Sequence, residues 1–483
     1  MNAKLRALNV TFAVFCLGSC AVGPNYVEPT MPAGAQQTAV SFDASVESKE
    51  GTPDAWWRLY NDPGLDGLLN EAFAANFDLK AAEANLTAAR AILEGAKVAR
   101  YPTTELSADT IRGRNPNTNQ ILELTGREPR TAWVYDASFD MSYEVDLFGR
   151  VRRTIEAARA EAGAAAAARD DLKVTLAAET TRAYVAVCSI GEEIAVAQRN
   201  LALVSEQARM TEGRRQAGAS SEFDVTRAQV LVAGERARIP PLEGQRRAAR
   251  FQLAALIGRV PSAAPTDVLN CTAPPRLASL IPVGDGAMLL RRRPDIREAE
   301  RALAAATAGI GIATADLYPR VSLLGLFGSV SDDFHKLGAS AGGFWQVGPS
   351  ISWQFPNMAG TLARIRQRKA GAAGALAHFE SVVLQALEET EQTLATYSAE
   401  LEHHAGLLEL EARSRHAYEL ANQQFRSGAI SNLDLLTAEE ALVAAEEQVA
   451  VSDAAVVQDQ VAIFKALGGG WATDVDGSVH SWR

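Results

Sequence analysis

The sequence of 483 residues is poor in cysteine and in aromatic side chains, and these shortages limit what the protein can be. Aromatic residues make up 7% of the chain whereas alanine is abundant, which favours closely packed helices over a thick core. Beyond residue 20 the chain contains only Cys188 and Cys271. Two such distant cysteines give neither a disulfide framework nor a metal-ligand spacing. We interpret both as buried thiols, with pairing between them as the alternative.

The sequence also lacks the motifs of an enzyme, a metal centre or a nucleic-acid-binding protein. The net charge of -11 and the isoelectric point of about 5.3 exclude a basic surface for nucleic acid. His403 and His404 are neighbours that point to different faces of a helix, and no HExxH motif is present. The segment Gly309-Ile310-Gly311 lacks the strand and the further glycines of a dinucleotide loop. We therefore predict no enzymatic activity, no metal and no cofactor other than a covalent lipid.

A cluster of three arginines, Arg291-Arg292-Arg293, stands directly before Pro294. One interpretation is a site for anionic lipid or phosphate. The other is a solvated stretch before a helix whose first residue is the proline, where its missing N–H costs nothing. We favour the solvated stretch.

The first twenty residues have the features of a bacterial lipoprotein signal. A positively charged start is followed by an apolar run over residues 8–17, which is too short to span a membrane as a mature helix. The sequence Leu-Gly-Ser-Cys that ends at Cys20 resembles a lipobox, so we predict a signal peptide over residues 1–19 and a lipid on Cys20. By resemblance to bacterial lipoproteins, Ala21 in place of Asp implies sorting to the outer membrane. An ordinary signal peptide with a chance cysteine is the alternative.

The residues after the cysteine are rich in Pro, Gly, Ser and Thr. This composition predicts an extended, lipid-anchored tether over residues 20–63 that lies along the protein. Trp56 and Trp57 are the side chains that we expect to hold the tether in place.

The segment from Trp133 to Asp146, WVYDASFDMSYEVD, alternates apolar and polar side chains over its whole length. This period of two is typical of a β-strand with one apolar and one wet face. Aromatic residues lie toward both ends of the apolar face, as in strands of outer-membrane barrels. A strand of a soluble sandwich is the alternative, although such strands are usually about five or six residues long. A similar alternation runs from Trp345 to Phe355, and the segment from Val321 to Val330 is a weaker strand candidate.

The chain contains an internal duplication. Tyr101-Pro102 recurs 217 residues later as Tyr318-Pro319, and Gly218-Ala219 recurs 210 residues later as Gly428-Ala429. One offset that holds over a long stretch is the signature of repeated architecture. The change of offset between the two pairs predicts a longer β-hairpin loop in the first copy.

The duplication divides the chain into consecutive parts. We predict a first repeat over residues 64–258, a link over 259–286, a second repeat over 287–468 and a tail over 469–483. Each repeat is predicted to contain a helix, a β-hairpin and a long helical hairpin.

Two stretches without proline predict very long helices, from Arg150 to about Arg215 and from Thr361 to Arg426. Leucine and alanine recur at seven-residue intervals in both, which indicates coiled-coil packing. Each helix would be about 100 Å long at about 1.5 Å per residue. Pro240-Pro241 is predicted to break the first return helix near Ile239.

The two helical hairpins are predicted to turn at matched residues. Gly218 and Gly428 suit the left-handed conformation that ends a helix. Ser221 and Ser431 follow as N-caps of the return helices.

The strands and the helices together require several copies of the chain. Four membrane strands cannot close, and an open edge in hydrocarbon leaves backbone groups unsatisfied. Two copies would give eight strands with a filled interior, and three would give twelve with room for a lumen. The long helices are too polar for the membrane and must project from it as a helical tube.

The sequence resembles the TolC-like outer membrane efflux channels, in the NodT-type lipoprotein branch that serves resistance-nodulation-division pumps. The resemblance covers essentially the whole mature chain. It rests on four segments: Cys20 with VGPNY at 22–26, YEVDLFGR at 143–150, LRRRPDI at 290–296 and KALGGGW at 465–471.

The resemblance implies an α+β membrane protein that forms a homotrimer, with a twelve-stranded barrel continued by a periplasmic tunnel of twelve helices. It also implies a periplasmic adaptor and an inner-membrane pump as partners, and a passive efflux conduit for drugs, other small molecules or metal ions. The runner-up interpretation is a structural coiled-coil envelope lipoprotein without transport activity. That protein would share the lipobox and helices but would not need the alternating strands.

In the family, leucines and an acidic residue just after the second turn form the periplasmic constriction. By position, Leu433 and Leu436 match the leucines. The acidic position holds Thr437, which departs from the family, and Asp434 is a possible second ring. The alternative is that both leucines only pack the helical hairpin. The turns at Gly218, Ser221, Gly428 and Ser431 are the implied contacts for the adaptor.

Overall fold

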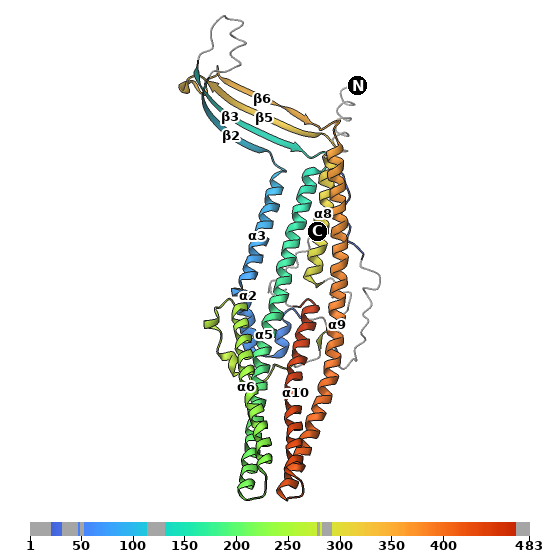
Figure 1. Ribbon diagram of the computed structural model, residues 1–483. Coiled ribbons are helices and arrows are strands. Elements are labelled where there is room, and N and C mark those ends of the chain that lie inside the picture. The colour runs from blue at the N-terminus through green and yellow to red at the C-terminus, as the bar shows by residue number, and fades with distance from the viewer. Residues whose placement is uncertain are drawn as a thin grey trace. The chain divides into compact units, whose positions relative to one another are not determined.

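Figure 1 shows a computed structural model of the chain, which describes residues 21–30, 47–48, 53–113, 131–277, 281–282 and 292–469. Most of these residues are helical, and a four-stranded sheet and a short two-stranded sheet accompany the helices. The α-helices are α2 (Pro63–Ala75), α3 (Phe77–Val98), α5 (Arg150–Gln216), α6 (Glu222–Leu256), α8 (Pro294–Ala315), α9 (Ala359–Arg426) and α10 (Asn432–Ala466). The strands are β1 (Glu47–Ser48), β2 (Thr103–Gly113), β3 (Ala132–Val145), β4 (Ile281–Pro282), β5 (Arg320–Ser331) and β6 (Gly343–Ser352). Short 3-10 helices are η1 (Trp56–Tyr60), η2 (Pro261–Ala263), η3 (Asp267–Asn270) and η4 (Phe334–Lys336).

The element order is the same in both halves of the sequence. A helix, two strands and two long helices occur first as α3-β2-β3-α5-α6 and again as α8-β5-β6-α9-α10. The long helices α5 and α9 contain 67 and 68 residues, close to the predicted bounds. In α5, heptad positions such as Leu176, Ala183 and Val187 are buried, as coiled-coil packing requires.

The four long strands form one antiparallel sheet in the order β2-β3-β5-β6 (Figure 1). The predicted strand from Trp133 to Asp146 is confirmed as β3, displaced by one residue. Strand β6 ends at Ser352, so Trp353 and Phe355, which we expected in this strand, follow it instead. Because β3 of the first half pairs with β5 of the second, one sheet joins both halves.

The predicted break at Pro240-Pro241 is wrong, because α6 continues through both prolines to Leu256. Each proline lacks an N–H, which leaves the carbonyls of Arg236 and Ala237 without helical donors. Both of those residues are exposed, so water can satisfy the carbonyls. The fixed φ of proline is itself compatible with a helix, and the helix therefore persists.

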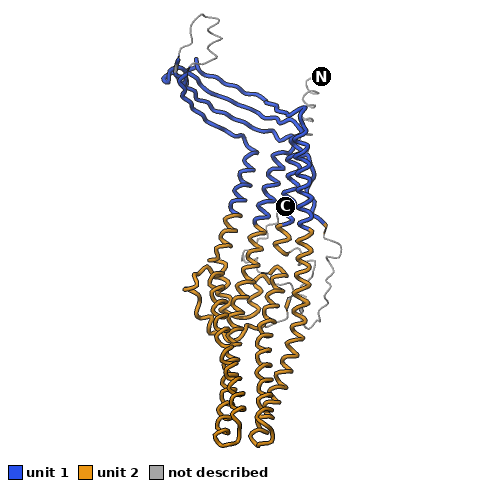
Figure 2. Tube along the Cα trace, in the orientation of Figure 1, with its two compact units in different colours: residues 1–29, 86–165, 299–379 blue, residues 30–85, 166–298, 380–483 orange. Residues whose placement is uncertain are grey.

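The chain forms two compact units, which Figure 2 shows in different colours. Unit 1 contains residues 1–29, 86–165 and 299–379, and unit 2 contains residues 30–85, 166–298 and 380–483. Each unit takes segments from both halves of the sequence. The four-stranded sheet lies within unit 1, and both helical turns lie within unit 2.

The aromatic residues of η1 lie in the core of unit 2. Trp56 and Trp57, which we expected to hold the tether in place, are both buried. The Trp56 ring stacks on Phe464 of α10 with centroids 4.7 Å apart. Leu65, Leu69 and the helix α5 contribute further apolar side chains to this core.

Candidate functional site

One face of the sheet is apolar across all four strands. Phe139 of β3 lies opposite Leu106 of β2 and Phe327 of β5, and Phe327 lies opposite Trp345 of β6. Directly opposed residues in antiparallel strands share a face. These side chains are exposed, and 75% of Trp345 is accessible. A continuous exposed row of this kind marks a surface that another apolar phase covers.

The other face of the sheet carries hydroxyl and carboxylate side chains. Ser107 and Ser138 lie opposite each other, and their hydroxyl oxygens are 2.8 Å apart. Asp109 and Asp136 form a like-charged opposed pair two residues further on. Carboxylates that face one another are tolerated only where water screens them, so this face suits an aqueous lumen.

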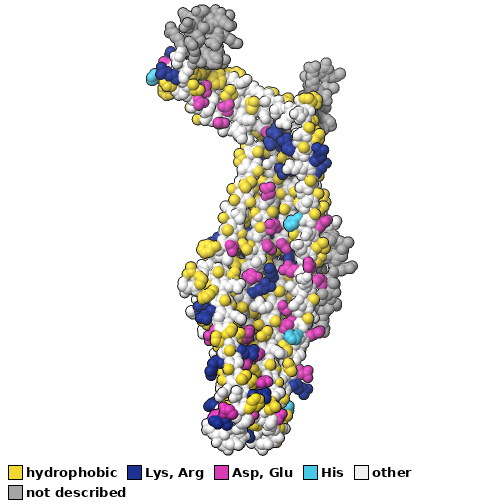
Figure 3. Space-filling model, viewed as in Figure 1, with side chains coloured by type: hydrophobic (Ala, Val, Ile, Leu, Met, Phe, Trp, Pro, Cys, Tyr) yellow, Lys and Arg dark blue, Asp and Glu magenta, His cyan; other side chains and the backbone are white. Residues whose placement is uncertain are grey.

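The long helices have a mixed surface. Figure 3 shows apolar side chains interleaved with acidic and basic ones along the helices on the viewed face. Among the described helices, α9 includes an 18-residue window with a mean hydropathy of 1.2, which is long and apolar enough to cross a membrane by length and composition alone. One such helix is weak evidence for a membrane span.

Both helical hairpins end in the same local structure. Gly218 and Gly428 have left-handed φ angles of 75° and 79°, which confirms their predicted role. Ser221 begins α6 with a capping box, in which the Asp224 N–H donates to the serine Oγ over 3.2 Å and the serine N–H donates back to the carboxylate over 2.9 Å. Ser431 forms the same box with Asp434 over 3.3 and 3.0 Å. The predicted N-caps are therefore confirmed.

The two turns lie together at one end of unit 2 (Figure 1). The Arg214 guanidinium lies over the Phe425 ring, 4.2 Å from its centroid. Gln207 and Thr211 of α5 each donate to the Asn432 Oδ1 over 3.4 Å. These contacts join the end of α5 to the end of α9 and the start of α10.

The candidate gate residues differ in exposure. The Leu433 side chain is 48% exposed, whereas Leu436 is 2% exposed and packs inside the helical hairpin. Thr437 is exposed one turn after Leu433, and its hydroxyl donates to the Leu433 carbonyl over 2.9 Å. The Asp434 carboxylate accepts hydrogen bonds from Ser431, which hold the pKa of Asp434 below its usual value. Within one chain, Leu433 and Thr437 are thus the exposed side chains, and Asp434 is engaged in the cap.

Sequence reasoning did not identify Glu439, which is buried two turns into α10. Both of its carboxylate oxygens lack a hydrogen-bond partner among the described residues. Burial, with a smaller contribution from the neighbouring charge of Glu440, raises the pKa of Glu439 to about 7. The available signal was its spacing from Leu435 and Leu442, since a buried seam on α10 passes through position 439.

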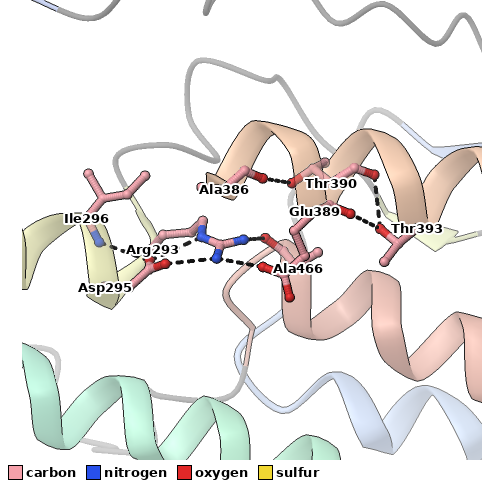
Figure 4. A network of polar contacts seen from close by, with 8 residues as sticks. All are labelled: Arg293, Asp295, Ile296, Ala386, Glu389, Thr390, Thr393 and Ala466. Carbon is pink, nitrogen blue, oxygen red and sulfur yellow. Dashed lines mark hydrogen bonds and ion pairs between the residues drawn. The ribbon is translucent and has the colours of Figure 1, made fainter. Parts of the chain in front are cut away.

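The preferred interpretation of the arginine cluster as solvated is wrong for Arg292 and Arg293, whereas the helix α8 does begin at Pro294 as expected. Arg293 is largely buried and donates to Asp295 and Glu389, each over 2.8 Å, and to the Ala466 carbonyl over 2.7 Å (Figure 4). Arg292 pairs with Asp54. Arg291 lies outside the described residues. Arg293 therefore connects the start of α8 to α9 and to the end of α10 within unit 2.

The preferred interpretation of Cys188 and Cys271 as free thiols is also wrong, because the two cysteines form a disulfide. The link after α6 returns to α5 and brings the two Cα atoms to 4.8 Å. Gly191 makes room for this approach, since a Cβ there would lie 2.6 Å from the Cys271 carbonyl oxygen. Arg246 of α6 donates to the carbonyls of Val187 and Cys271 over 3.0 and 2.6 Å and so orders the link beside the disulfide.

Cys20, the predicted lipid attachment residue, lies outside the described residues. Within the described ranges, no group of three or more His, Cys, Asp and Glu side chains is arranged to hold a metal ion.

A sheet with one apolar and one aqueous face, joined to helices with a mixed surface, defines the class of protein. This combination is typical of a membrane channel with an apolar sheet and water-exposed helices. The chain belongs to the outer membrane efflux protein family, whose sequence profile matches residues 68–259 and 287–469. It is a TolC-like channel of an efflux pump, located in the outer membrane and extending into the periplasm.

Relatives of known role are similar over nearly the whole chain. The pyoverdine export outer membrane protein OpmQ of Pseudomonas putida is 31% identical over 455 residues, which cover 92% of this chain and 95% of OpmQ. The toluene efflux pump outer membrane protein TtgC of Pseudomonas putida is 30% identical over 476 residues, which cover 98% and 96%. Among solved structures, the outer-membrane channel OprN is 36% identical with a TM-score of 0.84, covering 94% of this chain and all of that one.

These similarities confirm the resemblance drawn from the sequence. The relatives are channel proteins rather than enzymes, and they are components of pumps. The runner-up interpretation, a structural envelope lipoprotein, does not explain the apolar sheet face or the family match.

Proposed function

We propose that three copies of this chain form one efflux conduit, with a twelve-stranded barrel in the outer membrane and a helical tunnel in the periplasm. The observation that carries this proposal is the apolar face that crosses all four strands. A sheet with a lipid-facing row must bury its backbone hydrogen bonds, yet β2 and β6 are both edge strands within one chain. Pairing β6 of one copy with β2 of the next removes every edge.

The number of copies follows from the size of the barrel. With four strands from each chain, two copies supply eight strands, whose interior is just filled by side chains. Three copies supply twelve and leave a lumen lined by the face that carries Ser138 and Asp136. A water-filled lumen is what a conduit for solutes requires.

The experiment is native electrophoresis and mass measurement of the full protein extracted in mild detergent. We expect a heat-modifiable oligomer of three chains that contains both helix and strand by circular dichroism. A stable monomer, or a dimer that conducts ions in bilayers, would overturn the trimer.

A lipid on Cys20 is part of the proposal. Its support is the lipobox, together with the sequence VGPNY that follows at 22–26. Mass spectrometry of the mature amino terminus should detect the acyl groups, and Cys20→Ser should abolish them. An unmodified wild-type amino terminus would contradict this part of the proposal.

Leu433 is proposed as the main closing residue at the tip of the tunnel. It is the exposed leucine of the pair, and Thr437 lies one turn away on the same side of α10. Leu436 is assigned to hairpin packing because it is buried within the chain. Asp434 can add a ring of charge only if its carboxylate leaves the capping box.

The turns are proposed as contacts for a periplasmic adaptor protein, which joins the channel to an inner-membrane pump. Gly218, Ser221, Gly428 and Ser431 lie at the exposed end of the helical hairpins.

Relatives are named for export of pyoverdine and efflux of toluene, so small organic molecules are the proposed cargo class. The paired pump, rather than the wide conduit, selects among them. Complementation of a pump-deficient strain, scored by resistance to a panel of solvents and antibiotics, tests the cargo class.

A further inference from the structure

Residues 21–26, the mature chain immediately after Cys20, lie against two helices of unit 1. The Val22 N–H donates to the Phe148 carbonyl over 3.1 Å, just before α5 begins. The Tyr26 hydroxyl donates to Glu300 of α8 over 2.9 Å. The segment therefore contacts elements from both halves of the sequence, α5 from the first and α8 from the second.

Arg153, in the first turn of α5, grips the middle of this segment. Its side chain is 4% exposed, and its nitrogens donate to the carbonyls of Val22 and Gly23, each over 3.4 Å. A third and shorter bond, 2.7 Å, goes to the Asn25 Oδ1. Glu156 balances the charge from 2.8 Å. The buried Arg153 guanidinium thus donates most of its hydrogen bonds to this one segment, through two backbone carbonyls and the Asn25 side chain, and so binds it specifically.

Three glycines allow the close approach. A Cβ at Gly23 would lie 2.5 Å from the Gly311 Cα, and one at Gly149 would lie 2.6 Å from the Ala21 Cβ. A Cβ at Gly311 would meet the Arg153 side chain at 2.8 Å. Gly309, two residues earlier on α8, has nothing nearer than 3.8 Å and is not part of the contact. Gly309 and Gly311 of α8 lack the features of a dinucleotide loop. Gly311 thus contributes to the surface that binds this segment, whereas Gly309 does not.

Tyr26 closes the far end of the contact. Burial and the Glu300 carboxylate raise the pKa of Tyr26, so the phenol stays protonated and remains a donor at every physiological pH.

We propose that residues 21–26 are a docking peptide, and that the surface formed by Arg153, Gly149 and Gly311 is its binding site, which holds the lipid-bearing amino terminus of the mature chain. The inference rests on the proposed lipid at Cys20. Consecutive Cα atoms are about 3.8 Å apart, so docking of Ala21 confines the acylated residue to the junction where β3 ends and α5 begins. The acyl chains then enter the bilayer beside the strands of the same chain. Arg153 is a positioning residue in this scheme.

The test is hydrogen exchange, read by mass spectrometry, on the full-length protein in lipid nanodiscs. In the wild type the Val22 amide should be protected. Arg153→Gln and Gly311→Ala should each speed its exchange about tenfold or more, because each removes or blocks the charged hydrogen bonds that hold the segment. Arg153→Lys, which keeps the charge but offers its N–H donors from a single nitrogen, should retain part of the protection.

Two matched controls separate docking from general damage. Arg152→Gln changes the neighbouring arginine, which pairs with Asp146 instead. Gly309→Ala adds the same methyl group to α8 without a clash. Both should exchange as the wild type does. The exchange of amides in the middle of α5 shows whether each variant is folded. If these amides exchange faster in Gly311→Ala, that variant is set aside and Arg153→Gln alone tests the docking site.

The outcomes distinguish the inference from the lipid proposal. Wild-type protection of Val22 in Arg153→Gln would overturn the docking site, whether or not Cys20 carries lipid. Mass spectrometry of the same samples reports the lipid separately. An unmodified amino terminus with a protected Val22 would overturn the claim that the site holds a lipid-bearing terminus, and would leave a docked peptide without an anchor.

Discussion

Glu439 is a carboxylate in an unusual environment. It is completely buried in the helical hairpin, and neither oxygen has a partner among the described residues. Its pKa rises from an ordinary 4.5 to about 7. The unfolded chain releases this proton more readily than the folded chain, so the folded state is favoured most below pH 4.5. Stability then falls as the pH rises toward 7.

Glu439→Gln should therefore stabilise the helical region at alkaline pH. The expected gain at pH 8 is roughly 2 kcal/mol, and it should vanish near pH 4.5 because the wild-type carboxyl is then neutral as well. Thermal unfolding followed by circular dichroism across this pH range measures the gain. Glu440→Gln, a change at the exposed neighbour, is the control. If the stabilities of the wild type and Glu439→Gln depend on pH in the same way, the buried Glu439 carboxylate does not destabilise the folded state when it is charged.

Leu433 is the residue at which the proposed gate can be tested. Leu433→Ser should increase conductance in planar bilayers, because it replaces an exposed apolar side chain at the tip with a small polar one. Leu387→Ser, a change in the seam of α9 far along the chain from the turn, should increase it less. Equal effects of both substitutions, or no effect, would assign Leu433 to helix packing and move the gate elsewhere.

At the scale of elements, each strand of the four-stranded sheet has one apolar face and one polar face. Alternation along β5 places neighbouring residues on opposite faces, so Phe327 joins the apolar row whereas Leu326 lies opposite Asp140 and Gln346. The same residue type placed at these two positions meets lipid at one and water at the other.

Phe327→Arg should therefore impair barrel assembly, whereas Leu326→Arg should be tolerated. A charged side chain on the lipid face costs about 2–4 kcal/mol near the bilayer centre. Heat-modifiable oligomer in outer-membrane fractions, quantified by electrophoresis, measures the difference. If both variants assemble equally, the apolar row does not face lipid.

At the scale of the whole molecule, contacts between distant segments tie the link and the helices together. The Cys188–Cys271 disulfide joins residues 83 positions apart, and Arg246 fastens the same stretch through backbone carbonyls. In unit 2, the link, α5 and α6 therefore form one connected body.

Removing the disulfide should lower the stability of this body. A covalent loop of this size contributes about 4 kcal/mol by restricting the unfolded chain, and measured losses are typically 2–5 kcal/mol. Cys188→Ala with Cys271→Ala should lower the unfolding temperature, and reductant should do the same to the wild type. The double variant should not respond to reductant. A response there would mean that the reductant acts on something other than this bond.

The features that depend on residues close together in the chain could be predicted from the amino-acid sequence alone. Alternation specified β3, heptads specified α5 and α9, and Gly218 and Gly428 with their serines specified the turns. Each of these signals is local, because strand faces, helix seams and caps are set within a few residues. The family motifs indicated an efflux channel because each of them is also a short continuous segment.

Only the tertiary structure decided which distant residues meet. It paired Cys188 with Cys271, buried Arg293 among three elements and placed residues 21–26 on Arg153. These partners lie tens to hundreds of positions apart, so no periodicity connects them. It also showed that Leu433 is exposed and Leu436 is buried, because the exposure of each side chain depends on what the neighbouring helices cover. The continuation of α6 through Pro240 was decided in the same way, by the exposure of two carbonyls to water, which spacing along the chain does not reveal.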